Sequence, residues 1–284
     1  MTGANKYVFP FDDKAKQFAE EHLNETEENR EAALKSIKQW IQDNSHLNAR
    51  TEDEHILPFL RGCKFNLDKT KQKITNFYTM KRDRPEWFEN RDPSLPELQE
   101  LVRLGVFVPL RQLHDNKLVV IIKTAAHDPR RHKQDDVFKV GKMILDVACM
   151  ECEIASVYGV VAIFDMTGVS LAHARQLPPR VIKKAVFAWQ NYHCRPKQLE
   201  FVNAPVYINV VLNVFKSFMS EKLKGRVKVH FKGFEDLHKS VDKNILPEEY
   251  GGCGEDLADL RQYWEKKLVE YTEWFVEDGK YKAE

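Results

Sequence analysis

The sequence lacks an excess of charge of either sign. Its 284 residues include 44 Lys and Arg against 43 Asp and Glu, so the formal net charge is +1. A protein that binds nucleic acid over its whole surface carries a strong positive excess, so this class is excluded, although a local basic patch is not. Charged residues make up 31% of the chain and hydrophobic residues 43%, the mix of a folded globular protein.

Long hydrophobic runs, glycine, proline and cysteine are also scarce. The longest mostly apolar stretch, 201–215, is interrupted by Pro205 and three asparagines, and it is shorter than the roughly 20 residues that cross a bilayer. The 12 Gly and 12 Pro are too few for a collagen-like or low-complexity chain. Because the first residues show no export signal and the five cysteines are an odd number, we expect a cytoplasmic protein with reduced thiols.

Motifs of known enzymes and metal sites are absent from the sequence. It contains no GxSxG elbow, no Walker A loop and no GxGxxG fingerprint. Cys149 and Cys152 form a CxxC pair inside a helical pattern with no second CxxC or HxxxH, which favours half-buried thiols over a zinc or redox site. Asp165 ends an expected strand, where α/β sheets place ligands, but capping of the next turn is the favoured interpretation. We therefore expect no catalytic residue, no metal and no cofactor.

Helices are expected through most of residues 1–90. Between 27 and 42, apolar residues recur at spacings of three and four, and Thr26 is placed to cap this helix. Pro85 and an Arg-Asp-Pro cluster then end the helical pattern, which places a domain boundary near residues 89–95.

The pattern changes after this boundary to that of an α/β domain over residues 91–255. The β-branched runs 118–122 and 160–164 fit buried strands of a largely parallel sheet, and the segment 137–147 between them has one apolar helical face. Strand, helix and strand together make a βαβ unit. Two further strands are expected at 199–203 and 227–231. A C-terminal helical tail is expected at 256–284.

Residues 176–234 combine an apolar helix with a concentration of basic side chains. A helix from Val206 to Met219 is apolar on nearly every side except a stripe of Asn209, Asn213 and Lys216. It is therefore either a core helix or one that contacts a hydrophobic molecule or a membrane. The region has eleven basic residues against two acidic ones. Such a patch suits an anionic membrane, where each Lys or Arg contributes about 1 kcal/mol, whereas a solvated surface with acidic neighbours is the alternative.

Four motifs, in the same order and spacing, resemble the CRAL-TRIO lipid-binding family and the helical domain that precedes it. The motifs are Leu57–Phe65, Gly159–Asp165, Asn203–Leu223 and Leu246–Gly252. The resemblance is to the group that carries tocopherol and retinoids. It implies an α/β CRAL-TRIO domain, with a mostly parallel sheet flanked by helices around a lipid cavity, after an all-helical N-terminal domain. It also implies a cytosolic carrier that transfers a small hydrophobic ligand between membranes, with the helix at 206–219 as a mobile gate.

The resemblance implies two sets of site residues. In tocopherol carriers four basic residues hold a phosphoinositide head group, and the matching positions are Arg195, Lys197, Lys222 and Arg226. The helix positions that face the ligand match Phe138, Gly141 and Leu145, and two of these are serines in the relatives, so this cavity wall is more apolar. The strands and helices that follow add five expected lining residues: Val160, Phe164, Phe187, Val211 and Phe215.

These observations predict a non-enzymatic, monomeric carrier. Its expected partners are a ligand of the tocopherol or retinoid class and a phosphoinositide-containing membrane surface, to which it binds peripherally and transiently, and no nucleic acid. A phosphatidylinositol or other phospholipid transfer protein is the first alternative, and it would need polar groups inside the cavity. An α/β hydrolase-like enzyme and a signalling scaffold that senses lipid are the other two.

Overall fold

The computed structural model describes residues 7–231 and 233–284, and the chain divides into two compact units. The helical unit ends at Arg82 and includes the last four residues, Tyr281–Glu284, whereas the α/β unit runs from Asp83 to Lys280. The boundary expected near residues 89–95 from Pro85 and the Arg-Asp-Pro cluster lies a few residues after this division. Pro85 instead opens a short helix, since proline fits the first helical turn.

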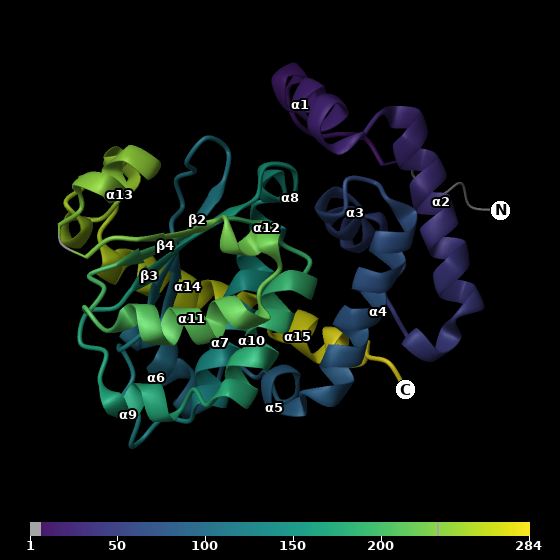
Figure 1. Ribbon diagram of the computed structural model, residues 1–284. Coiled ribbons are helices and arrows are strands. Elements are labelled where there is room, and N and C mark those ends of the chain that lie inside the picture. Colours follow the sequence, from purple (N-terminus) through teal and green to yellow (C-terminus); the bar gives the residue numbers. More distant parts are fainter. Residues whose placement is uncertain (1–6, 232) are drawn as a thin grey trace. The chain divides into compact units, whose positions relative to one another are not determined.

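The helical unit contains four α-helices in the described residues (Figure 1). They are α1 (Asp13–Leu23), α2 (Glu27–Asp43), α3 (Asp53–Gly62) and α4 (Leu67–Asp83), with the 3₁₀ turn η1 (Ser45–Leu47) after α2. Thr26 caps α2 as predicted, because its hydroxyl accepts a hydrogen bond of 3.1 Å from the Asn29 amide. Asn66 caps α4 in the same way through the Lys69 amide. The chain returns to this unit at its end, where the Ala283 amide donates to the Tyr78 carbonyl.

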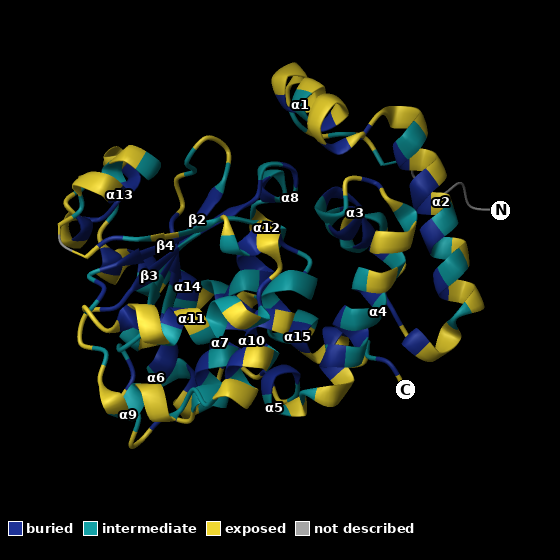
Figure 2. Ribbon diagram, viewed as in Figure 1, coloured by how far each residue is buried: buried dark blue, intermediate teal, exposed yellow. Residues whose placement is uncertain are grey.

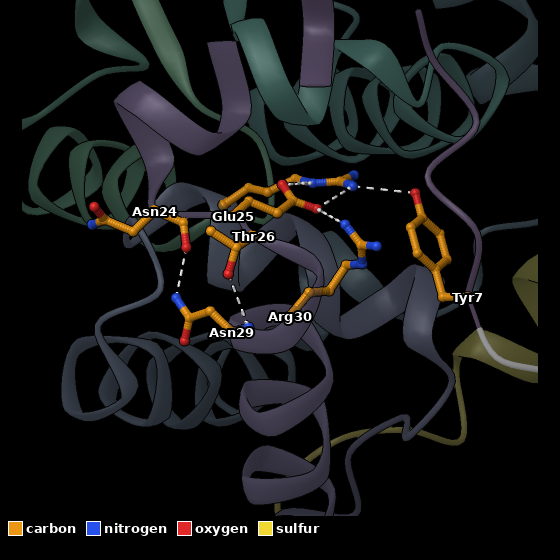
Figure 3. Close-up of polar contacts among 7 residues, drawn as sticks. Tyr7, Asn24, Glu25, Thr26, Asn29 and Arg30 are labelled. Carbon is orange, nitrogen blue, oxygen red and sulfur yellow. Dashed lines mark hydrogen bonds and ion pairs between the residues drawn. The ribbon is translucent and has the colours of Figure 1, made fainter. Parts of the chain in front are cut away.

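A buried charged cluster joins the start of α2 to α3 in the helical unit. The Glu25 carboxylate accepts two hydrogen bonds of 2.8 Å from Arg61, and the Tyr7 hydroxyl lies 3.1 Å from the same guanidinium. Figure 3 shows Tyr7 and Arg30 on the same side of Glu25, with Arg30 3.6 Å from the carboxylate. Burial opposes the charge of Arg61, but its bonds to Glu25 outweigh burial and raise its pKa. The loss of one partner would leave a buried charge uncompensated.

A five-stranded mixed sheet forms the centre of the α/β unit, with its strands in sequence order. The strands are β1 (Phe107–Pro109), β2 (Leu118–Lys123), β3 (Val160–Asp165), β4 (Pro196–Val202) and β5 (Val227–Val229). Only β1 is antiparallel to its neighbour. The predicted α/β fold class and the four predicted strands are confirmed. The strand β1 was not predicted, because three residues are too few to show a periodic pattern.

Helices precede the sheet, connect its parallel strands and pack around it. Before β3 they are α5 (Pro85–Phe88), α6 (Pro96–Leu104), α7 (Gln134–Glu151) and α8 (Ile154–Tyr158). Between β3 and β5 they are α9 (Leu171–Arg175), α10 (Pro179–Asn191), α11 (Ile208–Phe218) and α12 (Glu221–Lys224). Since right-handed crossovers that advance in one direction place their helices on one face, α7, α10 and α11 share a side of the sheet. Figure 1 shows α9, α10 and α11 gathered below the strands.

The C-terminal helices belong to the α/β unit rather than forming a separate tail. After β5 come α13 (Glu235–Ser240), the 3₁₀ turns η2 (Lys243–Ile245) and η3 (Glu248–Tyr250), α14 (Leu257–Glu270) and α15 (Thr272–Asp278). The helix α14 packs against α6, α7 and β1, and the Trp264 indole donates a 2.7 Å hydrogen bond to the Pro109 carbonyl. Across the described residues, no helix combines the length and the hydropathy needed to cross a membrane.

Candidate functional site

A cavity of about 360 Å³ lies between one face of the sheet and helices α7, α9, α10 and α11. Alternate residues of a strand point to the same face, and the cavity floor follows this rule across three strands. The floor consists of Val120 and Ile122 of β2, Val160, Ala162 and Phe164 of β3, and Leu199 and Phe201 of β4. The floor is therefore apolar, apart from Lys123 at the end of β2, which also lines the cavity.

Seven of the eight residues expected to face a ligand line this cavity. They are Phe138, Gly141, Leu145, Val160, Phe164, Val211 and Phe215. Phe187 does not line it, because this side chain lies on the outer side of α10 and is 41% exposed. The inner side of α10 instead carries Ile182, Ala185 and Trp189, which are separated from Phe187 by about half a helical turn. The apolar residues of α10 are too widely distributed around the helix for the sequence to show which side faces the cavity.

Gly141 allows α7 to approach the first strand. A Cβ atom at this position would lie 2.5 Å from the ring of Phe107, closer than any van der Waals contact. The absence of a side chain at Gly141 thus lets the Phe107 ring form part of the cavity wall.

Stacked aromatic rings connect the sheet to α10 and α11. The rings of Phe164 and Phe201 stack with their centroids 4.6 Å apart, and Trp189 lies 5.6 Å from Phe164. Trp189 in turn stacks on Phe215 of α11 at 5.7 Å. Such pairs contribute about 0.5–1.5 kcal/mol each beyond their buried area, and the pair of Trp189 and Phe215 holds α11 against α10.

The mouth of the cavity is marked by side chains that both line it and face solvent. Leu171 of α9 is 72% exposed, Val210 of α11 is 71% exposed, and Tyr207 is half-exposed. The neighbouring Val206 is 90% exposed. In α11 only Ile208 and Leu212 are buried, and Figure 2 shows the helix with yellow and teal surfaces beside the dark blue strands. The cavity therefore opens where α9 and the start of α11 meet.

Lys142 is a polar wall residue that the sequence analysis missed. It lies on α7 among the predicted ligand-facing positions, because residue 142 follows Phe138 by four and precedes Leu145 by three. The side chain is nearly buried, with its Nζ atom 4.8 Å from the centre of the Trp87 ring. Burial lowers the pKa of Lys142 to about 8, although Asp146 partly opposes this shift. The helical spacing was a sufficient signal to find it.

Asp165 has the structural role that was favoured for it. Its carboxylate accepts hydrogen bonds from the Thr167 amide at 3.0 Å, from the Asn203 side chain at 3.0 Å and from the Tyr250 hydroxyl at 2.9 Å. Burial alone would raise the pKa of Asp165, but these hydrogen bonds outweigh burial and lower it. Asp165 thus connects the end of β3 to the turn that follows β4 and to η3.

The two CxxC thiols lie at the end of α7, half-buried as predicted. A hydrogen bond with Cys194, together with burial, raises the pKa of Cys149, and burial also raises that of Cys152. Both thiols are therefore held in the protonated, unreactive form. Within residues 7–231 and 233–284, no group of three or more His, Cys, Asp or Glu side chains is arranged to hold a metal ion.

The four predicted phosphoinositide-binding residues lie around the start of β4 and the end of α12. Arg195 is buried and donates to the Val157 carbonyl, while Arg226 donates to the Pro196 carbonyl. Lys197 is half-buried, and Lys222 is exposed on α12, three residues after the C-cap of α11. Burial lowers the pKa of Arg226. Lys232, another basic residue of this region, lies outside the described residues.

Comparison with protein families identifies the α/β unit. A model described as the CRAL/TRIO domain matches residues 103–252, which is more than half of the chain. The chain belongs to the CRAL/TRIO family. A second model, described as a Pinta-like UBA domain, matches residues 26–98. The CRAL-TRIO resemblance of the four sequence motifs is thus confirmed, and with it membership of a family that binds and transfers lipids.

Curated relatives and a solved structure agree with this assignment. The alpha-tocopherol transfer protein-like proteins of Mus musculus and Homo sapiens are 27% identical over 263 residues, which cover 92% of this chain and 75% of theirs. Clavesin-2 of Homo sapiens is 26% identical over 205 residues, or 72% of this chain and 62% of its own. The crystal structure of Sfh5 superposes with a TM-score of 0.60 at 14% identity, covering 88% of this chain and 98% of that one. The last similarity concerns the CRAL/TRIO fold alone.

Proposed function

We propose that this protein holds one hydrophobic molecule of the tocopherol or retinoid class in the cavity and transfers it between membranes. The observation that carries this proposal is the apolar cavity, whose mouth is rimmed by exposed apolar side chains. A ligand that buries about 500 Å² of apolar surface gains on the order of 12 kcal/mol before entropy losses, at about 25 cal/mol per Å². Desolvation of the ligand therefore supplies the driving force without any covalent step, and the proposal includes no enzymatic activity.

The transfer step is proposed to occur when α11 moves away from the sheet at a membrane. In the closed position the helix contributes Val211 and Phe215 to the cavity wall, while Val206 and Val210 face outward. An apolar outer surface has no favourable partner in water but has one in the acyl region of a bilayer. A membrane thus favours the open form, and a bound ligand favours the closed form through its contacts with Phe215.

We also propose that phosphoinositide bisphosphate in the membrane is recognised beside the end of this gate helix. Lys197 lies in β4, and Arg195 directly precedes this strand. Lys222 lies in α12, and Arg226 directly precedes β5. Arginine can bind phosphate with two parallel hydrogen bonds, and lysine contributes a compact charge. The protein would then act as a cytoplasmic monomer that attaches to membranes peripherally and transiently.

Native mass spectrometry of the full chain, purified from its own source and followed by lipid extraction, tests the proposal. The expected result is one hydrophobic molecule per chain. The variant Ala162→Phe fills the cavity floor and should lose this molecule, whereas Ala258→Phe, on the exposed side of α14, should retain it. A co-purifying phospholipid would favour the phospholipid transfer alternative. Retention of the same molecule by Ala162→Phe would contradict binding in the cavity.

A further inference from the structure

Lys142 places a positively charged side chain on the cavity wall. The residue is 9% exposed and lines the cavity from α7. In the described part of the chain, no hydrogen bond or ion pair involves its ammonium group. An ammonium group has three donors, and a buried charge is costly unless it is paired.

Three aromatic rings surround the charge but cannot accept its hydrogen bonds in full. The Nζ atom lies 4.8 Å from the ring centre of Trp87, 5.5 Å from that of Tyr192 and 5.7 Å from that of Phe88. Rings at these distances favour a cation electrostatically, so the site is arranged for a charged amine rather than for a neutral one. They leave the ammonium donors without a strong acceptor.

The nearest carboxylate is already engaged. Asp146, one turn further along α7, accepts from Arg91 at 2.9 Å, from the Tyr192 hydroxyl, and from His193 at 2.8 Å. Arg91 also contacts Asp278 at 2.5 Å. Asp146 therefore acts on Lys142 only through space, and the group lacks a direct counter-ion.

The charge lies away from the mouth of the cavity. It contacts Tyr192, which precedes the start of β4, whereas the mouth residue Tyr207 follows the end of β4. The parallel strands run between these two edges of the sheet. A molecule that enters with its hydrocarbon part toward the mouth would bring its head group to Lys142.

We infer that the ligand of this cavity is an amphiphile with a single carboxylate head group, which Lys142 binds at the inner end while the hydrocarbon body extends to the mouth. The inference rests on the proposed function and narrows its ligand to an acid of the fatty-acid or retinoid-acid type. One carboxylate balances one ammonium, whereas an alcohol leaves the charge uncompensated. A phospholipid head would bring further polar groups against Phe138, Gly141 and Leu145, the apolar positions beside Lys142 on α7.

A fluorescent polyene acid and its methyl ester distinguish this inference from simple apolar binding. We expect the full-length protein to bind cis-parinaric acid roughly 10- to 100-fold more tightly than its methyl ester, the range for a hydrogen bond between charged groups. Lys142→Met should bring the acid to the affinity of the ester and leave the ester within about twofold of its wild-type value. Lys142→Arg should retain most of the preference for the acid.

Lys139 provides the matched control on the same helix. It is also 9% exposed but does not line the cavity, so Lys139→Met should leave both affinities unchanged. Equal affinities of the wild-type protein for acid and ester would overturn the inference and leave lipophile carriage intact. Unchanged acid binding by Lys142→Met would overturn it as well. Absence of saturable binding of either probe would contradict both the inference and the proposed function. The comparison of acid and ester on the wild-type protein does not depend on whether any variant folds.

Discussion

Helices α7 and α11 both form apolar walls of the cavity, but they differ in what lies behind them. In α7 the sides that do not face the cavity are also buried, and Val140, Ile144 and Val147 have no exposed surface. In α11 only two residues are buried, and the outward side chain of Val210 is mostly exposed. Hydrophobicity alone makes the two helices look alike. Burial distinguishes them: α7 is packed on all sides, whereas α11 is packed only on the side that faces the cavity.

Under the proposed transfer mechanism, this difference gives α11 two favourable environments, the cavity and a bilayer, and α7 only one. Removal of α7 from the sheet would expose apolar surface on several sides, at a cost of about 25 cal/mol per Å². Removal of α11 exposes its inner side but allows its outer and inner apolar residues to enter a bilayer together. The outer surface is interrupted by Asn209 and Asn213, which are exposed in the closed form and can remain hydrated.

The largest expected effect comes from one charge placed on each helix. Ile144→Asp in α7 should destabilise the protein by at least about 4 kcal/mol, because the carboxylate would be buried without a partner. Val210→Asp in α11 should change the free energy of unfolding by less than about 0.5 kcal/mol, yet slow ligand transfer between vesicles. Urea denaturation and a fluorescence transfer assay measure the two quantities. Similar destabilisation by both variants would remove the distinction between the helices.

The second prediction compares the two sides of α11. Phe215→Asp places a charge where Trp189 now stacks, so it should weaken ligand retention and impair transfer, at a cost of several kcal/mol for an unpaired carboxylate. Asn213→Asp changes the exposed side and should have a much smaller effect. The measurements are ligand off-rates and transfer rates between vesicles. Normal transfer by Phe215→Asp would indicate that α11 is an ordinary core helix.

The third prediction concerns the buried charge of the fixed wall. The pKa of Lys142 is about 8 when folded against 10.5 ordinarily, so the unfolded chain binds the proton more tightly. Lysine therefore destabilises the ligand-free fold below pH 8, and stability rises with pH between about 8 and 10.5. Lys142→Met should stabilise the ligand-free protein at pH 7 by about 1–3 kcal/mol and remove this rise. Chemical denaturation at several pH values measures it, and equal pH profiles for the two proteins would contradict the assignment.

The smallest effect is expected at the basic end of α11. Lys222→Glu combined with Arg226→Glu should weaken binding to vesicles containing phosphoinositide bisphosphate by about 1 kcal/mol or more for each residue, without loss of ligand uptake from detergent. The double variant Lys243→Glu, Lys266→Glu reverses two other exposed charges and serves as the control. The difference should decrease with salt. Equal sedimentation of both variants with these vesicles at low and physiological salt would argue against this surface.

The comparison of α7 and α11 also explains which features the sequence could predict. Strands β2 and β3 and helix α7 were predictable because their patterns depend on local periodicity. The cavity-facing positions of α7 followed from the family motif, and Lys142 could have been found by extending the same helical spacing. The outward position of Phe187 and the burial of Arg195 depend on which distant elements pack nearby. Such contacts leave no periodic signal in the sequence.

Hydrogen–deuterium exchange of the full chain, followed by mass spectrometry, tests most directly whether α11 is the mobile wall of a ligand cavity. Exchange of α7 and α11 would be compared without ligand and with cis-parinaric acid or its methyl ester, whichever binds. We predict that α7 is protected in both states and that α11 exchanges rapidly without ligand and becomes protected when ligand is bound. Equal protection of α11 in both states, at the level of α7, would contradict the account.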